Sequence, residues 1–94
     1  MQLNNMQVKI KLFHRTTPVI LKKEKYMNGS CALIAVWGKR ILAELSLPSV
    51  FTDNLFPFVG SKDTLQSLID LGVIVKTDKA IGRFPVVQLT GVLA

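Results

Sequence analysis

Apolar and charged residues alternate in the first part of the chain, which predicts strands. Three segments follow this prediction, each ended by turn-forming residues: residues 7–13, 19–26 and 30–37. In the first segment every second residue is apolar, and Lys9 and Lys11 fall between them, the period of a half-buried strand. Residues 14–18 are predicted to form a loop that Pro18 stiffens. The third segment is nearly all apolar and should lie centrally in a sheet.

A tight turn at Gly38-Lys39 predicts a hairpin with a defined register, because two-residue turns favour glycine at the first position. This register pairs Val36 with Ile41, Ile34 with Ala43, and Ala32 with Leu45. These six residues would form one apolar face. The reverse face would pair Trp37 with Arg40, Ala35 with Leu42, Leu33 with Glu44, and Cys31 with Ser46. It is mixed, and we expect it to be half solvated or covered by the margin of a helix.

One short helix is predicted over about residues 61–72. Ser61 is a typical N-cap, and Asp63 stands where the helix dipole favours a carboxylate. The apolar stripe has helical spacing and consists of Leu65, Leu68 and Ile69. Gly72 is a natural left-handed terminator.

The remaining segments complete an α+β domain. They are an aromatic connector at 51–60 with possible edge pairing at 55–59, a buried strand at 73–75, a turn at 76–79 and a last strand at 85–90. The predicted fold is a twisted antiparallel sheet of five to six strands with one short helix packed on it. Residues 1–94 should form a single domain, with residues 1–5 disordered.

The composition indicates where in the cell the protein is expected. The 94 residues carry a net charge of +6 and one cysteine, so no internal disulfide can form, and a reducing interior is the simpler interpretation. The first residues lack the pattern of a signal peptide. The longest apolar stretch, residues 32–37, is far shorter than a membrane helix. We therefore expect a cytoplasmic protein of a bacterial host cell with no membrane partner, starting naturally at Met1 or Met6.

The excess positive charge is concentrated near the N-terminus. Residues 1–27 carry six basic residues against one acidic residue, a net of +5, whereas residues 28–94 carry six against five, a net of +1. Lysines on edge strands deter unwanted pairing with other chains, which is one interpretation. The other is a docking surface for a nucleic-acid backbone or an acidic protein face.

Trp37 is a second candidate for contact with a partner. It is either a lid on the core or a binding hot spot, and its predicted neighbour Arg40 allows a cation–π contact at the hairpin tip. The candidate partner-binding residues are therefore Lys9, Lys11, Arg15, Lys22, Lys25, Trp37 and Arg40.

Motifs for catalysis, metal binding or cofactors are not found in the sequence. The single histidine, His14, and the single cysteine, Cys31, lack metal-ligand spacing. His14 is expected in a loop, and Cys31 is expected to be an inert packing residue. The first turn of the helix after Ser61 is either an ordinary cap or a place for an anion. We expect no enzymatic activity and no cofactor, although an enzyme stays a third possibility.

The order of turn and core motifs from residue 26 onward resembles a known group of proteins. These motifs are Asn28-Gly29, the Gly38-Lys39 turn, Ala-Glu-Leu-Ser-Leu-Pro at 43–48, Leu-Ile-Asp-Leu-Gly-Val-Ile at 68–74, and Gly-Arg-Phe-Pro-Val-Val-Gln-Leu at 82–89. The order is similar to that in small, uncharacterised proteins carried by bacteriophages and plasmids, over about residues 26–91. This chain is shorter between residues 47 and 56 and more basic. No catalytic residues come with the resemblance.

What the resemblance implies is an accessory protein of a mobile genetic element. The leading hypothesis is a non-enzymatic binding protein that inhibits a host system, such as the CRISPR antiphage defence, by masking a surface. Its partner would be a host protein or protein–nucleic-acid complex with an acidic face. The alternative hypothesis is a basic nucleic-acid-binding module. A homodimer formed by edge strands across a two-fold axis also stays open.

Overall fold

A computed structural model describes residues 4–51 and 54–94 of the chain. The first sheet has the order β1-β2-β3-β4, with strands β1 (Asn5–Leu12), β2 (Arg15–Lys25), β3 (Cys31–Trp37) and β4 (Arg40–Glu44). The second has the order β5-β7-β6, with strands β5 (Leu55–Pro57), β6 (Ile74–Ile81) and β7 (Phe84–Leu89). Helix α1 (Lys62–Asp70) separates β5 from β6, and the short 3-10 helix η1 (Gly91–Leu93) follows β7.

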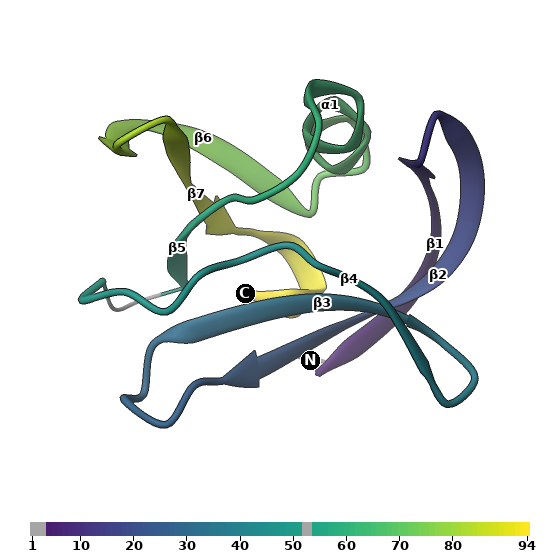
Figure 1. Ribbon diagram of the computed structural model, residues 1–94, viewed down its shortest axis with the longest axis horizontal. Coiled ribbons are helices and arrows are strands. Elements are labelled where there is room, and N and C mark those ends of the chain that lie inside the picture. The colour runs from purple at the N-terminus through teal and green to yellow at the C-terminus, as the bar shows by residue number, and fades with distance from the viewer. Residues whose placement is uncertain (1–3, 52–53) are drawn as a thin grey trace.

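The α+β class is confirmed, but the strands form two antiparallel sheets instead of one. In the part of the chain that the structure describes, an isolated bridge between Ser46 and Phe58 connects them. On either side of it, the Val59 N–H donates to the Leu45 carbonyl at 3.0 Å and the Leu47 N–H donates to the Pro57 carbonyl at 3.3 Å, while the Phe58 N–H donates to the Pro85 carbonyl at 2.8 Å. Figure 1 shows the second sheet and α1 lying across one face of the first sheet, its inner face.

The turn between β1 and β2 differs from its prediction. The chain reverses within two residues, Phe13 and His14, and Leu12 pairs with Arg15 directly after them. The predicted loop at 14–18 is therefore wrong. Pro18 lies inside β2, opposite Lys9 and before the first residue of β2 that pairs with β3. Its missing N–H would point away from β1, where no ladder bond is needed, so the strand continues through it.

The β3–β4 hairpin keeps the predicted turn but loses the predicted register halfway along. Gly38 has φ of 60°, and the pairs Trp37–Arg40 and Val36–Ile41 are as predicted. The register then shifts between Ala35 and Val36, so that Ile34 faces Glu44 and Ala35 faces Ala43. Leu42 is the extra residue of a bulge, which bends the strand and increases its twist.

With this shift, the face of β3 that points into the core is the opposite of the predicted one. The core side of β3 carries Leu33 and Ala35, both fully buried, and not the predicted set of Ala32, Ile34 and Val36. The buried cluster takes residues from both sheets, α1 and η1: Ile10, Leu12, Val19, Leu21, Cys31, Leu33, Ala35, Leu45, Phe56, Phe58, Leu68, Val73, Ile74, Val87, Leu89 and Leu93. The predicted central position of β3 is confirmed, because it lies between β2 and β4, and Ala32 and Val36 on its other face are also buried.

Helix α1 follows its prediction closely. The Ser61 hydroxyl accepts the Thr64 N–H at 3.1 Å, and Leu68 is fully buried. Gly72 has φ of 74°, the left-handed conformation that ends the helix. The helix packs against the end of β1 and against β6 (Figure 1).

Two further predictions concern segments outside the sheets' centres. The predicted turn at 76–79 is wrong, since β6 continues to Ile81 through an irregularity, and the chain turns at Gly82 instead. Of the N-terminal residues expected to be disordered, 1–3 lie outside the described residues. Asn5 opens β1, and the Asn4 carbonyl accepts the Lys23 N–H at 2.7 Å. Within the described ranges, no helix has the length and apolar character needed to cross a membrane.

Candidate partner-binding surface

Three of the seven predicted site residues share the outer face of the first sheet, the face opposite the buried cluster. Lys9 pairs with Pro18, Lys11 with Thr16, and Lys22 with Ile34. Their neighbours along β1, Ile10 and Leu12, point into the core. Because side chains alternate across a strand, the three lysines point outward.

The other four predicted residues do not join this group. Their register places them on the face that carries the buried cluster, at the ends of the strands and outside that cluster: Arg15, Lys25, Trp37 and Arg40. Trp37 is 45% exposed. In the described residues the cation–π contacts are Lys79 over Phe51 and Arg83 over Phe84, so the contact that the sequence allowed between Trp37 and Arg40 is not formed there.

The outer face has an apolar centre and mixed charge at one end. Its centre consists of Ile20, Ile34, Val36 and Ile41, of which Ile41 is 61% exposed. Glu24 and Glu44 share the end that holds Lys22, whereas Lys9 and Lys11 lie at the other end. Lys11 also lines a shallow depression with two carboxylates of α1, Asp63 and Asp70. The charge of the hairpin is thus partly balanced, and its most basic end adjoins the β1–β2 turn.

The β1–β2 turn is the main feature that sequence reasoning missed. Phe13 has φ of 54° and His14 has φ of 64°, so two successive non-glycine residues occupy the left-handed region. Both angles are positive in a type I′ turn, where Asn-Gly is the usual sequence. Each such residue is disfavoured by about 1–2 kcal/mol relative to an ordinary backbone. Phe13 is nevertheless 71% exposed.

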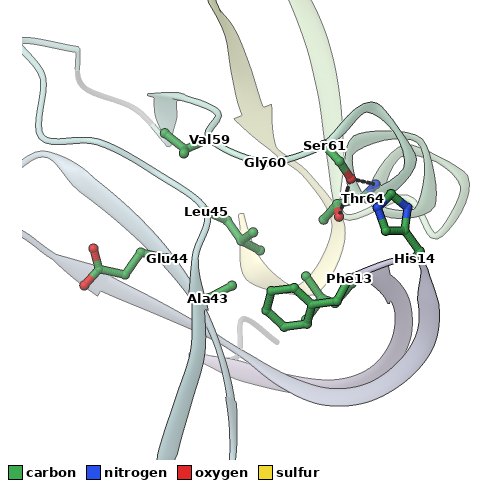
Figure 2. Close-up of a pocket in the computed structure, with 10 residues that line it drawn as sticks. Phe13, His14, Ala43, Glu44, Leu45, Val59, Gly60, Ser61 and Thr64 are labelled. Atoms are coloured by element: carbon green, nitrogen blue, oxygen red, sulfur yellow. Dashed lines mark hydrogen bonds between the residues drawn. The ribbon is translucent and has the colours of Figure 1, made fainter.

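Beside this turn lies an apolar cavity of about 310 Å³. Its walls come from the β1–β2 turn, the end of β4 and the chain that leads into α1: Leu12, Phe13, His14, Ala43, Glu44, Leu45, Val59, Gly60, Ser61 and Thr64. Figure 2 shows the Phe13 ring directed toward Ala43, the His14 imidazole beside Thr64, and the Glu44 carboxylate pointing away from the cavity. The cavity is therefore an open apolar hollow with a polar rim.

The polar groups on the helix side of the cavity are occupied. The Ser61 hydroxyl bonds to both the N–H and the hydroxyl of Thr64, at 3.1 and 3.0 Å. The Thr64 hydroxyl in turn donates to the Lys11 carbonyl. These bonds tie α1 to β1 and favour the ordinary cap over an anion site. The exposed Phe13 ring and the apolar wall are what the cavity offers to a ligand.

The structure describes the surroundings of Cys31 and of the side chains that could bind a metal ion. Burial raises the pKa of the Cys31 thiol, and only the neighbouring Lys23 ammonium opposes that shift. A thiol of this kind is a poor nucleophile. Over residues 4–51 and 54–94, no group of three or more histidine, cysteine, aspartate or glutamate side chains is arranged to hold a metal ion.

Comparisons with protein-family models, with curated proteins and with solved structures each returned no match.

Proposed function

We propose that this protein is a non-enzymatic binding protein whose contact surface is the β1–β2 turn with its adjoining cavity. The observation that carries the proposal is the exposed Phe13 ring, held in a disfavoured backbone conformation beside an open apolar hollow. Strained residues persist where the surrounding structure holds them, and they cluster at binding sites. A large exposed aromatic ring next to a hollow matches the anatomy of a binding hot spot.

The charges around the turn favour a partner with an acidic face. Arg15 directly follows the turn, and Lys9 and Lys11 lead up to it on the outer face. Such exposed charges speed encounter and make association sensitive to salt, while the buried aromatic contact sets the dissociation rate. The proposed partner is therefore a protein surface that receives Phe13 in an apolar depression with acidic residues around it.

The biological setting of the proposal comes from the resemblance to proteins of bacteriophages and plasmids. In that setting the protein would belong to a mobile genetic element and would act inside a bacterial host. Its binding would mask a surface of a host system, such as the CRISPR antiphage defence. Masking requires only a stable contact, which a small domain with an exposed contact surface can supply.

A second candidate function is nucleic-acid binding, favoured by the three lysines that share the outer face. Proteins that bind single strands combine such charges with aromatic side chains that stack on bases. Trp37 lies on the inner face, the Phe13 ring is directed toward Ala43 (Figure 2), and Tyr26 is half-buried with its hydroxyl bonded to Ser46, so these three rings form no stacking platform beside the lysines. If this candidate were right, affinity would fall steeply with salt, because phosphate contacts would dominate.

Capture of proteins from a bacterial lysate, quantified by mass spectrometry, tests the proposal. The bait is the full chain, compared with the double variant Phe13→Asn with His14→Gly. The matched control is Ile81→Asn, which removes an apolar residue that is 46% exposed beside the turn of the other sheet. We expect one protein that the full chain and the control retain and the double variant loses. Retention of nucleic acid alone would support the second candidate instead.

A further inference from the structure

Strand β1 is an edge of the first sheet, and its backbone groups alternate in direction. The Asn4 carbonyl bonds to Lys23 of β2, so even-numbered residues of β1 direct their backbone groups toward β2. Odd-numbered residues direct theirs away from the sheet. The contacts of Lys11 agree with this: its N–H donates to the Ser67 hydroxyl of α1 at 3.1 Å, and its carbonyl accepts from Thr64.

Helix α1 covers only the Lys11 end of this edge. In residues 4–51 and 54–94, no hydrogen bond is formed by the outward backbone groups of Gln7 and Lys9. Both residues are exposed. The short helix η1 also lies near β1, but the outward backbone groups of Gln7 and Lys9 have no hydrogen-bond partner in the described residues and bond to water. About five residues of an added strand would fit before α1 blocks the way, which is close to the mean length of a strand.

The side chains along the open edge specify what an added strand would carry. On the inner side Met6 and Val8 are partly buried and pack against the margin of the core. On the outer side stand Gln7, Lys9 and Lys11. Residues directly opposite in an antiparallel pair share a face, and opposite charges there are favourable. An added strand along the open part of the edge would therefore place apolar residues against Met6 and Val8 and an acidic residue against Lys9, with Lys11 next along the same face.

We infer that the open edge of β1 binds an extended segment of a partner protein in which acidic and apolar residues alternate. This inference rests on the proposed function and names the chemistry of the acidic partner. Main-chain hydrogen bonds to Gln7 and Lys9 supply the contact, and the lysines select the charge. A second copy of the chain fits worse, because pairing β1 with its own copy would bring lysines of both copies to one face.

The test uses a capped eight-residue peptide that alternates valine and glutamate, titrated into the full chain by NMR. A peptide of the same composition in two blocks, and one that alternates valine and lysine, are the controls. We expect binding of the valine–glutamate peptide alone, with slowed hydrogen exchange at the amides of Gln7 and Lys9. The amides of Met6 and Val8 already bond to β2 and should change little. Equal binding of the blocked peptide, or no change at Gln7 and Lys9, overturns the inference.

A charge reversal, Lys9→Glu with Lys11→Glu, checks the role of the lysines. It should weaken the valine–glutamate peptide at least about fivefold and switch the preference to the valine–lysine peptide. The matched control, Lys22→Glu with Lys25→Glu, makes the same charge change on β2 and should keep the original preference. If both reversals act alike, general charge attraction explains the binding and the inference is wrong. Failure of the peptide with continued Phe13-dependent capture from lysate overturns only this inference and leaves the proposed function standing.

Discussion

Replacing the strained turn with Asn-Gly, through Phe13→Asn with His14→Gly, should make the fold more stable. The turn keeps its left-handed conformation but is occupied by two residues that tolerate it, which gains about 2–4 kcal/mol, at about 1–2 kcal/mol for each position. Two terms oppose this gain. Glycine makes the unfolded chain more flexible, which offsets about 0.5–1 kcal/mol. Phe13 is 71% exposed, so removing its ring sacrifices the burial of only a minor part of roughly 200 Å², worth about 1.5 kcal/mol at ~25 cal/mol per Å².

The net effect is a stabilisation of about 1 kcal/mol, which raises the melting temperature of a domain of this size by about 4–8 °C. Urea denaturation followed by circular dichroism measures the change directly, provided the slope m is equal in both proteins. A melting temperature that falls by several degrees would refute the reasoning, because Phe13 would then be a packing residue rather than an exposed side chain. The single variant His14→Gly separates backbone strain from side-chain packing, since it leaves the Phe13 ring in place.

Three further outcomes follow from individual contacts. Because burial raises the pKa of Cys31, iodoacetamide should alkylate it more slowly in the folded protein than in urea, and equal rates would contradict this. For the same reason, the free energy of unfolding should decline as the pH rises above the ordinary thiol pKa. Thr64→Val removes the hydroxyl that donates to the Lys11 carbonyl and should lower the free energy of unfolding by about 1–2 kcal/mol, measured in urea; no loss would mean that water replaces the bond. Trp37→Ala should leave the protein folded, because Trp37 is 45% exposed; a collapsed melting transition would make Trp37 a core residue.

The helix caps and the Gly38 turn were predictable from the sequence, because each depends on a few neighbouring residues. Ser61 and Gly72 bracket α1 because capping depends on the cap residues themselves. The Gly38 turn is of the same kind. The bulge at Leu42 was not predictable, because an unbroken register already places six apolar residues on one face and no residue of β4 marks a bulge. The choice of core face depends on what packs from the second sheet, which the pattern of β3 does not encode.

The candidate site was harder to predict than the fold. The lysines of the first hairpin were visible as an excess of charge, but the register divides the seven candidate residues between two sides of the sheet. The turn at Phe13 and His14 carries no sequence signal, since neither residue favours positive φ as asparagine or glycine does. A loop was predicted at 14–18 because of Pro18, but a proline is compatible with a strand at a position where its N–H would form no bond to the neighbouring strand.

Photo-crosslinking from position 13 tests most directly whether the turn is the contact surface. Phe13 is replaced by p-benzoylphenylalanine, which keeps an aromatic ring at the turn, and Ile81 is replaced in the same way as the control. Irradiation in a bacterial lysate should yield a covalent adduct with one host protein from position 13 and not from position 81. The same adduct from both positions, or adducts from position 81 alone, would contradict the proposal that this protein binds its partner through the β1–β2 turn.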